Sequence, residues 1–429
     1  MIFAQKEKAA ASAVTPTSSG PRSPRSRIES LLADTTGSSV IELVATLIED
    51  AYTLRTSDIH IEPVADSVTV RFRIDGVLQD AYSLPRIILP EVISRVKILA
   101  SLRTDEHQAA QDGRFHIVVD AHDIDVRVSI TPTYYGENAV LRLLADNSTD
   151  FNLTALGFSE DNQKKIVAAV RRPHGMILAT GPTGSGKTTT LYTLVKMLES
   201  KDISIVTIED PIEYAMPGIT QIQMNQRTGL SFANGLRSIL RQDPDVIMVG
   251  EIRDSETAGI AVNTSLTGHL LLSTLHTNDA ATTLPRLLDM GIDAYLVAST
   301  VNIAIGQRLV RRLCPDCKKK VTLSDIERTA LTDSLPPRLQ KAHKSTGNIF
   351  YENVGCASCD NTGFSGRVGL YEVLTVTPAV RDAILKKSSA TVIRDIAIEE
   401  GMTTMFEDGL GKALAGETTI REVLRTINE

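Results

Sequence analysis

The stretch "GPTGSGKTTT" at residues 181–190 decides the fold class of this chain. It fits the pattern GxxxxGK[ST], follows the short apolar run "GMILAT" at 175–180, and leads into "KTTTLYTLVKMLES", which we expect to form a helix. Glycines let such a loop curl so that several backbone N–H groups point at phosphate oxygens, and the helix N-terminus adds its dipole. The sequence therefore predicts a phosphate-binding loop; a glycine-rich turn without a ligand is the alternative.

Two residues of this loop have predicted roles. Lys187 should reach the β- and γ-phosphates of a bound nucleotide, and the Thr188 hydroxyl should bind Mg²⁺. No guanine-recognition motif such as NKxD is present in the sequence. The predicted nucleotide-binding residues are Gly181, Pro182, Thr183, Gly184, Ser185, Gly186, Lys187, Thr188 and Thr189.

Apolar runs continue after the loop, at 203–210 ("ISIVTIED"), 245–251 ("DVIMVGE") and 269–276 ("HLLLSTLH"). Nearly continuous apolar runs suit strands that are buried on both faces. Because helical segments alternate with these runs from about residue 156 onward, the pattern predicts a parallel sheet with helices on its faces. We therefore expect an α/β phosphate-loop domain over 156–429.

Carboxylates follow two of these predicted strands. Glu209, Asp210 and Glu213 lie at the end of the first run after the loop, and Glu251 lies at the end of the second. The carboxyl ends of strands in an open parallel sheet gather at the ligand-binding edge. A carboxylate there can hold Mg²⁺ through water or orient the attacking water, whereas a solvated strand end is the alternative for either residue alone.

Two histidines flank the apolar core of "TGHLLLSTLHTNDA". The spacing of His269 and His276 places them at the two ends of a strand and on opposite faces. We expect both to lie near the same edge of the sheet and to sense or contact the γ-phosphate; purely structural histidines are the alternative. Zinc binding by this pair is not expected, because no cysteine or carboxylate pattern accompanies it.

A smaller α+β domain is predicted ahead of the phosphate loop, over residues 28–146. Apolar side chains recur at helical spacing over 40–51, and they alternate at strand spacing in "SVTVRFRIDG", which ends in a hairpin turn at Asp75–Gly76. A second helix is expected from about 90 to 102. Further strands are expected at "RFHIVVD", "DIDVRVSI" and "AVLRLL", the second of which turns Arg127 away from Ile124, Val126, Val128 and Ile130.

The segments that flank this domain are polar. Residues 1–27 are rich in Ala, Ser, Thr and Pro and end in "PRSPRSR", which predicts a disordered arm. Contact of the basic cluster with anionic lipid is the alternative to a solvated tail. Residues 147–155 are expected to be a linker between the two domains.

The composition excludes several classes of protein. A chain of 429 residues is long enough for two to three domains with a well-buried core. Its net charge of −7, its pI of about 5.7 and its 4% aromatic content argue against a broad nucleic-acid-binding surface. No apolar run approaches the roughly 18 residues of a membrane span, and the N-terminus lacks a signal-peptide core. We therefore expect a cytoplasmic protein that contacts the membrane only through partners.

The only four cysteines form the pairs "CPDC" at 314–317 and "CASC" at 356–359. Four thiolates in two CxxC pairs are the right number for a closed tetrahedral zinc site. Disulfides are disfavoured in a cytosolic chain, and a redox pair needs no second pair; oxidised or unmetallated thiols are the alternatives. We expect a zinc subdomain over 312–366 inserted in the phosphate-loop domain, followed by a mainly helical part over 367–429. The predicted zinc ligands are Cys314, Cys317, Cys356 and Cys359.

The segment 318–355 between the two pairs is polar and Lys-rich, so contact with nucleic acid stays open for it. All four predicted ligands come from the protein, which leaves no open coordination position for catalysis. We therefore expect a metal clip that holds a protruding insertion, where a partner could dock.

Longer motifs give the chain a family resemblance. In the first domain they are "SDIHIEP" (57–63), "RFRIDG" (71–76), "QDGRF" (111–115) and "GENAVLRLL" (136–144). In the second they are the phosphate loop, "TIEDPIEY", "ILRQDPDVIMVGEIRD", "TGHLLLSTLHTNDA", "QRLVRRLCPDC" and "GRVGLYEVL". Over about residues 40–429 the chain resembles the type II/type IV secretion-traffic ATPase family, especially the assembly ATPases of type II secretion (general secretory pathway E) and of type IV pili.

The resemblance implies an architecture and an activity. It implies a RecA-like motor domain behind a PAS-like α+β domain, arranged as a homohexameric ring that hydrolyses ATP with Mg²⁺ and assembles a pilus or pseudopilus. The implied partners are a polytopic inner-membrane platform protein and the cytoplasmic domains of the membrane assembly complex. Many such ATPases carry a further N-terminal docking domain, so recruitment here is expected to use the short arm, the ring face or a separate protein.

The resemblance also implies roles for the acidic residues and the histidines. Glu251 would be the general base or would position the attacking water, and Glu209 would help to hold the water or the metal. His269 and His276 would couple the γ-phosphate to domain closure.

Two arginines of the first domain are implied to take part in catalysis. Arg127 and Arg142, on adjacent predicted strands, would reach the phosphates when their domain closes on a motor domain. Phosphoryl transfer needs cationic groups at the equatorial oxygens, which a mobile domain supplies only when it is closed. A salt-bridged strand face is the alternative for this pair.

Three other functions are alternatives to fibre assembly. A pilus retraction ATPase would resemble this chain without the two CxxC pairs. A nucleic-acid or conjugation motor would show DNA-stimulated turnover, against which the acidic pI and the few aromatic residues argue. A hydrolysis-dead scaffold would lack a catalytic residue type, whereas every expected type is present.

Overall fold

The computed structural model of the protein falls into two compact units, one ending at Asp146 and the other beginning at Asn147. The predicted arm before Arg27, the first part of the predicted linker and most of the segment between the cysteine pairs lie outside the described residues. No helix within the described ranges is long and apolar enough to cross a membrane. The described residues are 27, 28, 31, 40–119, 122–145, 152–322 and 349–428.

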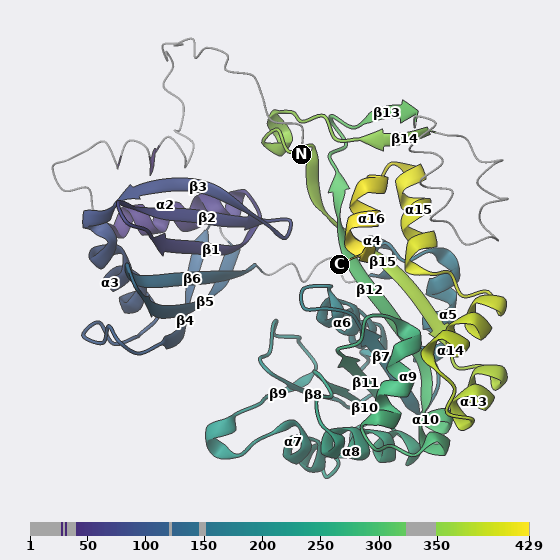
Figure 1. The fold of residues 1–429 in the computed structure, drawn as a ribbon. Helices are drawn as coiled ribbons and strands as arrows, with labels where there is room; N and C mark the ends of the chain where they lie inside the picture. The colour runs from purple at the N-terminus through teal and green to yellow at the C-terminus, as the bar shows by residue number, and fades with distance from the viewer. Residues whose placement is uncertain are drawn as a thin grey trace. The chain divides into compact units, whose positions relative to one another are not determined.

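The described part of the first unit contains an antiparallel sheet of strand order β3-β2-β1-β6-β5-β4, with the helices α2 and α3 against one face (Figure 1). The predicted hairpin turn is confirmed, because Asp75 and Gly76 have φ values of 50° and 86°, the left-handed pair that a tight hairpin requires. The elements of this unit are α2 (Val40–Thr53), β1 (Thr56–Pro63), β2 (Ser67–Ile74), β3 (Val77–Pro85), η1 (Arg86–Ile88), α3 (Leu89–Leu99), β4 (Gln111–Val119), β5 (His122–Thr133) and β6 (Gly136–Ala145).

The apolar spacing explains how this unit packs. In α2 the residues Val44, Leu47, Ile48 and Ala51 are buried, as their helical spacing predicts, while Ile41 is exposed. The predicted alternation in β5 is also confirmed, since every second residue from Ile124 to Ile130 is buried in the core. Strands β1 and β3 were not predicted.

The second unit contains a seven-stranded sheet of order β15-β12-β7-β11-β10-β8-β9, parallel except for β15 (Figure 1). It has the strand–helix alternation that the sequence predicts. Its elements up to β12 are α4 (Leu153–Leu156), α5 (Glu160–Val170), β7 (Gly175–Thr180), α6 (Lys187–Leu198), β8 (Ile205–Glu209), β9 (Thr220–Gln223), η3 (Gln226–Thr228), α7 (Phe232–Ile239), β10 (Val246–Val249), α8 (Ser255–Leu266), β11 (Leu270–Leu275), α9 (Ala280–Asp289), α10 (Ala294–Thr300) and β12 (Val301–Leu313).

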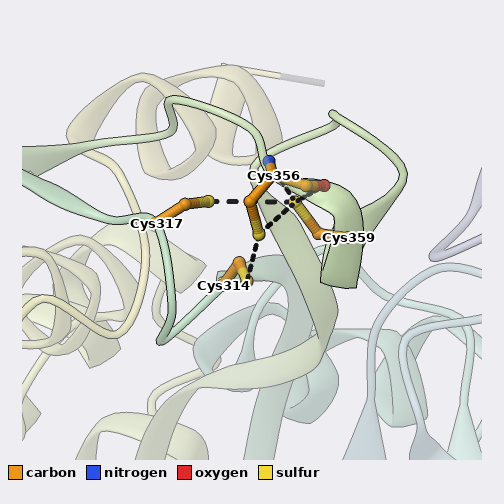
Figure 2. A group of neighbouring side chains, drawn as sticks. All are labelled: Cys314, Cys317, Cys356 and Cys359. Carbon is orange, nitrogen blue, oxygen red and sulfur yellow. Dashed lines mark hydrogen bonds between the residues drawn. The ribbon is translucent and has the colours of Figure 1, made fainter.

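An antiparallel pair of long strands carries the cysteine subdomain. Strand β12 ends and β15 (Phe364–Thr375) begins beside the four cysteines, where Leu313 pairs with Phe364 (Figure 2). Between them lie the hairpin of β13 (Lys319–Thr322) and β14 (Ile349–Glu352) and the turn η4 (Ala357–Cys359).

The prediction that residues 367–429 are mainly helical is confirmed, although this part begins with a strand. Residues up to Thr375 form β15, which extends the central sheet through β12. The remaining residues are helical and comprise α13 (Pro378–Leu385), α14 (Ala390–Glu399), α15 (Met405–Ala415) and α16 (Ile420–Asn428).

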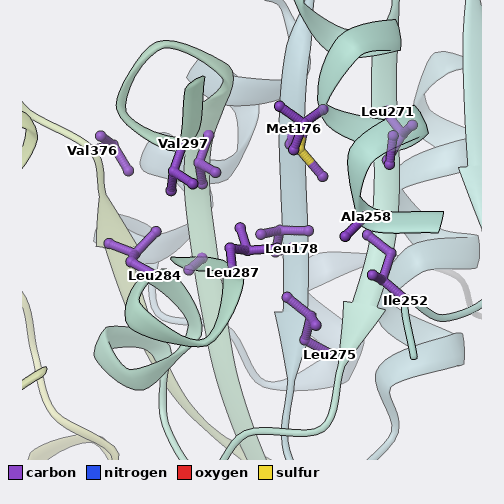
Figure 3. Packing of buried hydrophobic residues seen from close by; sticks show 14 of the residues in the cluster. Met176, Leu178, Ile252, Ala258, Leu271, Leu275, Leu284, Leu287, Val297 and Val376 are labelled. Atoms are coloured by element: carbon purple, nitrogen blue, oxygen red, sulfur yellow. The ribbon is translucent and has the colours of Figure 1, made fainter. Parts of the chain in front are cut away.

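The central sheet of the second unit is buried on both faces. In β7, Met176 and Leu178 face a core formed with α7, α8, α9 and α10, while Ile177 and Ala179 face a core formed with α5 and α6 (Figure 3). This two-sided burial is why the strand sequences are nearly continuously apolar. It also leaves the polar residues of this region at the strand ends, where the candidate site lies.

Candidate functional site

The phosphate loop connects β7 to α6 in the geometry that anion binding requires. Gly184 and Gly186 have φ values of 77° and 87°, so consecutive amides can turn toward one point at the N-terminus of α6. At Gly181, a Cβ would lie 2.4 Å from the carbonyl oxygen of Gln307, and φ is 147°. The loop backbone therefore has the conformation of a phosphate-binding loop. Glycine is needed at 181 because Gln307 of β12 leaves no room there for a side chain.

Lys187 lies over this loop. Its Nζ donates to the carbonyl oxygens of Gly181 and Pro182, each at 2.9 Å. Burial lowers the pKa of Lys187, the nearby charge of Glu251 raises it in part, and Arg308 lowers it further. The Ser185 hydroxyl is buried and has no hydrogen-bond partner among the described residues. A phosphate oxygen would fit this set of donors, because both groups can donate to it.

Glu251 follows β10 and lies between an arginine and a histidine. Its Oε1 is 2.5 Å from a terminal nitrogen of Arg253, and its Oε2 is 3.0 Å from Nε2 of His276. Burial alone would raise the pKa of Glu251, but the contacts with Arg253 and His276 hold it below its ordinary value. The carboxylate is therefore ionised at neutral pH, and its charge also reaches Lys187.

Glu209, at the end of β8, is in a different environment. It is 2% exposed, its Oε1 accepts from Thr207 at 2.6 Å and from Gln221 at 3.1 Å, and its Oε2 accepts the Tyr192 hydroxyl. Burial raises the pKa of Glu209 despite these three donors. A role in holding water or metal stays a prediction, and in this structure both oxygens are bonded to protein groups.

The two predicted histidines lie at opposite edges of the sheet, so the expectation that they share one edge is wrong. Strand β11 runs parallel to β7, with Leu270 beside Gly175 and Leu275 beside Thr180. His276 therefore lies at the phosphate-loop edge, whereas His269 lies at the other end of β11 and its Nδ1 is 3.2 Å from the Thr264 carbonyl oxygen. Because all strands beside β11 run in the same direction, its two ends lie at opposite edges of the sheet. Two residues that flank the same apolar run are therefore far from a common site.

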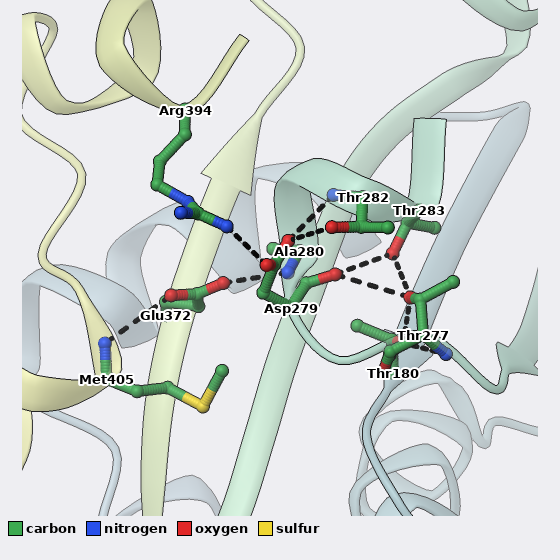
Figure 4. A network of polar contacts seen from close by, with 9 residues as sticks. All are labelled: Thr180, Thr277, Asp279, Ala280, Thr282, Thr283, Glu372, Arg394 and Met405. Carbon is green, nitrogen blue, oxygen red and sulfur yellow. Dashed lines mark hydrogen bonds and ion pairs between the residues drawn. The ribbon is translucent and has the colours of Figure 1, made fainter. Parts of the chain in front are cut away.

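A cluster of threonines fixes the segment that follows β11. The buried Thr180 hydroxyl lies 3.0 Å from the Leu275 carbonyl oxygen and 2.8 Å from that of Thr277, and it accepts the Thr277 amide at 3.1 Å (Figure 4). The Thr277 hydroxyl in turn lies 2.9 Å from that of Thr283 in α9. These contacts fix the backbone on both sides of His276 and so its approach to Glu251.

The same polar network extends to the C-terminal helices. Glu372 of β15 accepts the amide of Ala280 at 2.7 Å and that of Met405 at 3.4 Å, so one carboxylate meets the first residues of α9 and α15 (Figure 4). Burial raises the pKa of Glu372. Asp279, which caps α9 through the Thr282 amide, also pairs with Arg394 of α14. The phosphate-loop edge is therefore connected to the helices after β15.

In the first unit, the two predicted arginines lie directly opposite each other, Arg127 on β5 and Arg142 on β6. Arg114 of β4 lies opposite Arg127, so three arginines occupy one row on one face of the sheet. Arg142 Nε donates to Asp58 of β1 at 2.9 Å, and its side chain is 59% exposed. The alternative of a salt-bridged face thus holds in part, while the exposed guanidinium stays accessible.

The four cysteines meet at one point of the second unit. Their sulfur atoms all lie within 4.8 Å of one another, with Sγ separations of 3.9 Å for Cys314–Cys356, 3.8 Å for Cys317–Cys359 and 3.6 Å for Cys356–Cys359. A tetrahedron with metal–sulfur bonds of about 2.3 Å has edges of about 3.8 Å, whereas a disulfide needs about 2.05 Å. The sulfur positions therefore fit a four-coordinate metal and exclude disulfides in this structure.

Comparison with known proteins identifies the family. The model of the type II/IV secretion system protein family matches residues 33–425. The chain belongs to this family. It is 45% identical over 423 residues to the type II secretion system protein E of Xanthomonas campestris pv. campestris, covering 98% of the chain and 73% of that protein. It is also 45% identical over 387 residues to the type IV pilus assembly ATPase PilB of Myxococcus xanthus, covering 90% of the chain and 67% of that protein.

Solved structures have the same fold. The Legionella pneumophila ATPase DotB superposes with a TM-score of 0.66 at 22% identity, covering 92% of the chain and 97% of DotB, a likeness of fold alone. The pilus retraction motor PilT, solved with bound ADP, superposes with a TM-score of 0.60 at 26% identity, covering 88% of the chain and 95% of PilT. The predicted α/β phosphate-loop fold is confirmed.

Several site residues of this family member were not predicted. Arg253 follows Glu251 by two positions in "EIRD", so an arginine beside a strand-end acid was a visible signal. Arg114 stands in the quoted motif "QDGRF", but its alignment with Arg127 depends on strand register. Thr180 has no sequence signal, because its role depends on which strand lies beside β7.

Proposed function

We propose that the chain is a Mg²⁺-dependent ATPase motor that drives assembly of a pilus or pseudopilus, in type II secretion or in a type IV pilus system. One observation carries this proposal: an ionised Glu251, held by Arg253 and His276, lies at the sheet edge that bears the phosphate loop. The relative PilB, a type IV pilus assembly ATPase, supports the activity.

In this mechanism the loop amides, Lys187 and Ser185 bind the phosphates of ATP. The Thr188 hydroxyl at the start of α6 would hold Mg²⁺, which neutralises phosphate charge when it is bound. Glu251 accepts a proton from the attacking water, and His276 keeps the carboxylate aimed at the phosphate edge. Glu251 suits the base because it is ionised and borders solvent, while both oxygens of Glu209 are bonded to protein groups.

Arg127 and Arg142 complete the site in this proposal by meeting the phosphates during turnover. Cationic donors aimed at the equatorial oxygens stabilise charge that develops in the transition state. Holding several arginines in one cross-strand row destabilises a sheet, which supports a function for the row beyond folding.

The proposed assembly is a homohexameric ring that acts at the inner membrane. Its partners would be a polytopic platform protein and cytoplasmic domains of the secretion or pilus complex, with membrane contact made through these partners and none with nucleic acid. The four cysteines would hold Zn²⁺, which stabilises the junction of β12 and β15 and supplies no catalytic chemistry.

Pilus retraction is the second candidate function, because PilT is a structural neighbour. Assembly is favoured by the identity of 45% to PilB and to the type II secretion protein E, against 26% to PilT.

Steady-state ATP hydrolysis tests the proposal. We expect the wild-type chain to release phosphate from ATP in a Mg²⁺-dependent reaction, and we expect Lys187→Ala to reduce the rate to background. A matched control is Lys412→Arg, in α15, which keeps a cation in the buried pair with Asp408. Equal rates for the wild type and Lys187→Ala would refute the motor assignment.

A further inference from the structure

Asp58 of β1 lies between two arginines of neighbouring strands. Strand register places it directly opposite Arg73 of β2 and Arg142 of β6. Its side chain is 8% exposed, and its Oδ1 accepts Nε–H of Arg142 at 2.9 Å. Its Oδ2 lies 3.5 Å from Nε of Arg73 and accepts the Ser57 hydroxyl at 2.8 Å. Both oxygens of this carboxylate are therefore occupied within the sheet.

The surroundings of Asp58 are strongly cationic. Arg142, Arg127 and Arg114 occupy directly opposed positions on β6, β5 and β4. Like charges in such positions destabilise a sheet, so the row is costly to fold. Asp58 stands at the β1 end of this row and offsets part of its charge. Among the described residues, it is the one carboxylate that is hydrogen-bonded to Arg142.

The way in which Asp58 holds Arg142 leaves the useful edge of the guanidinium exposed. The bond runs through Nε, and the two terminal nitrogens of Arg142 make no hydrogen bond to the described residues. Terminal guanidinium nitrogens are the donors that bind phosphate in a bidentate way. Burial alone would raise the pKa of Asp58, but hydrogen bonds from Arg142 and Ser57 and the charges of both arginines hold it below its ordinary value. At neutral pH the contact between Asp58 and Arg142 is therefore a hydrogen bond between two charged groups.

We propose that Asp58 is a positioning residue for ATP hydrolysis, which fixes the Arg142 guanidinium through Nε so that its terminal nitrogens meet the nucleotide phosphates. This inference rests on the role proposed above for Arg142. Asp58 itself touches no reacting atom. Its effect is on orientation, and a displacement of about 1 Å in a catalytic group can reduce turnover about 100-fold.

The test is a double-mutant cycle in the full chain, measured as steady-state hydrolysis at saturating Mg²⁺ and ATP. Asp58→Asn keeps the shape of the side chain and removes its charge. We expect kcat to fall by about 10- to 100-fold, while KM changes by less than about threefold. In an Arg142→Ala background, the same substitution should change kcat by less than about twofold, because no guanidinium is left to orient.

Glu62→Gln is the matched control. Glu62 shares the face of β1 with Asp58 and pairs with Arg71 of β2 at 2.6 Å, outside the arginine row. We expect this variant to keep kcat within about twofold of the wild type. A loss of the same size in Asp58→Asn and in Glu62→Gln would show a general effect on the sheet and would overturn the inference.

The remaining outcomes separate the inference from the function on which it rests. If Arg142→Ala is slow but Asp58→Asn is as fast as the wild type, only the inference is overturned. Equal losses from Asp58→Asn with and without Arg142 would also overturn it, since the effect would not pass through that guanidinium. Full activity of Arg142→Ala would overturn both the proposed role of Arg142 and the inference.

Discussion

Replacing Thr180 by valine removes one hydroxyl from the network that fixes the segment after β11. Thr180 is fully buried, and valine has nearly the same shape. The hydroxyl accepts the Thr277 amide at 3.1 Å and donates toward the carbonyl oxygens of Leu275 and Thr277 at 3.0 and 2.8 Å. Among the described residues, the amide of Thr277 has no other acceptor, so the substitution leaves it buried and unpaired.

The magnitude follows from these contacts. An unpaired buried donor costs about 1–3 kcal/mol, and weakening of the two carbonyl contacts adds to it, so we expect Thr180→Val to lower the free energy of unfolding by about 2–3 kcal/mol. Thr180→Ser keeps the hydroxyl and loses one methyl group, for which about 1 kcal/mol is expected. Thr180→Val therefore reports on the hydrogen bonds and Thr180→Ser on the methyl group, and the valine variant should be the less stable of the two.

Urea unfolding followed by far-ultraviolet circular dichroism measures both variants, since the chain has no tryptophan to follow by fluorescence. Hydrogen exchange of the peptide that contains Thr277 then locates the loss, which should appear there and not in the first unit. If the valine variant unfolds at the same urea concentration as the wild type, the hydroxyl contributes nothing measurable and the reasoning is refuted.

Further predictions concern the proposed general base Glu251, the cysteines and pH. Glu251→Gln should keep ATP affinity within about threefold and lower kcat at least about 100-fold; undiminished turnover would point to Glu209 as the base. The chain purified in reductant should carry about one zinc per chain and Cys356→Ser less than about half of that, as metal analysis will show; a metal-free folded wild type would contradict the clip. Burial raises the pKa of Glu422, but its contacts with Arg311 and Arg425 hold it below the ordinary 4.5. The folded pKa is the lower one, so this stabilisation is present above about pH 4.5 and is lost as pH falls through the folded pKa. The urea midpoints of the wild type and Glu422→Gln should differ at pH 7 and converge in acid; a constant difference would refute this.

In the second unit, the strands that were predicted are those whose own sequence is a nearly continuous apolar run. The runs at β7, β8, β10 and β11 are apolar because helices cover both faces of the sheet. The strands β12 and β15 were missed as strands because Gln307, Arg308 and Arg311 interrupt the apolar pattern of β12. Their pairing joins residues on both sides of the cysteine insertion, and no local pattern specifies a contact of that kind.

The candidate site also combines residues that a short stretch of sequence identifies with residues that only strand order and register bring together. The phosphate loop is a contiguous motif, and Glu251 follows a recognisable buried strand, so both were predicted from short stretches. The contact between Glu251 and His276 needs strands β10 and β11 to be neighbours. The prediction for His269 was wrong because the two ends of one strand lie at opposite edges of a parallel sheet. Asp58 was not singled out, since its contact with Arg142 depends on the register between β1 and β6.

The hairpin of β13 and β14, between β12 and β15, has a practical consequence for engineering. Thr322 at the end of β13 pairs with Ile349 at the start of β14, so the chain leaves the hairpin and returns to it at the same place. Lengthening a flexible connection between two such opposed strand ends costs only about 0.6 kcal/mol for each doubling. A fluorescent or affinity module inserted there would report on the motor without interrupting a strand of its catalytic sheet.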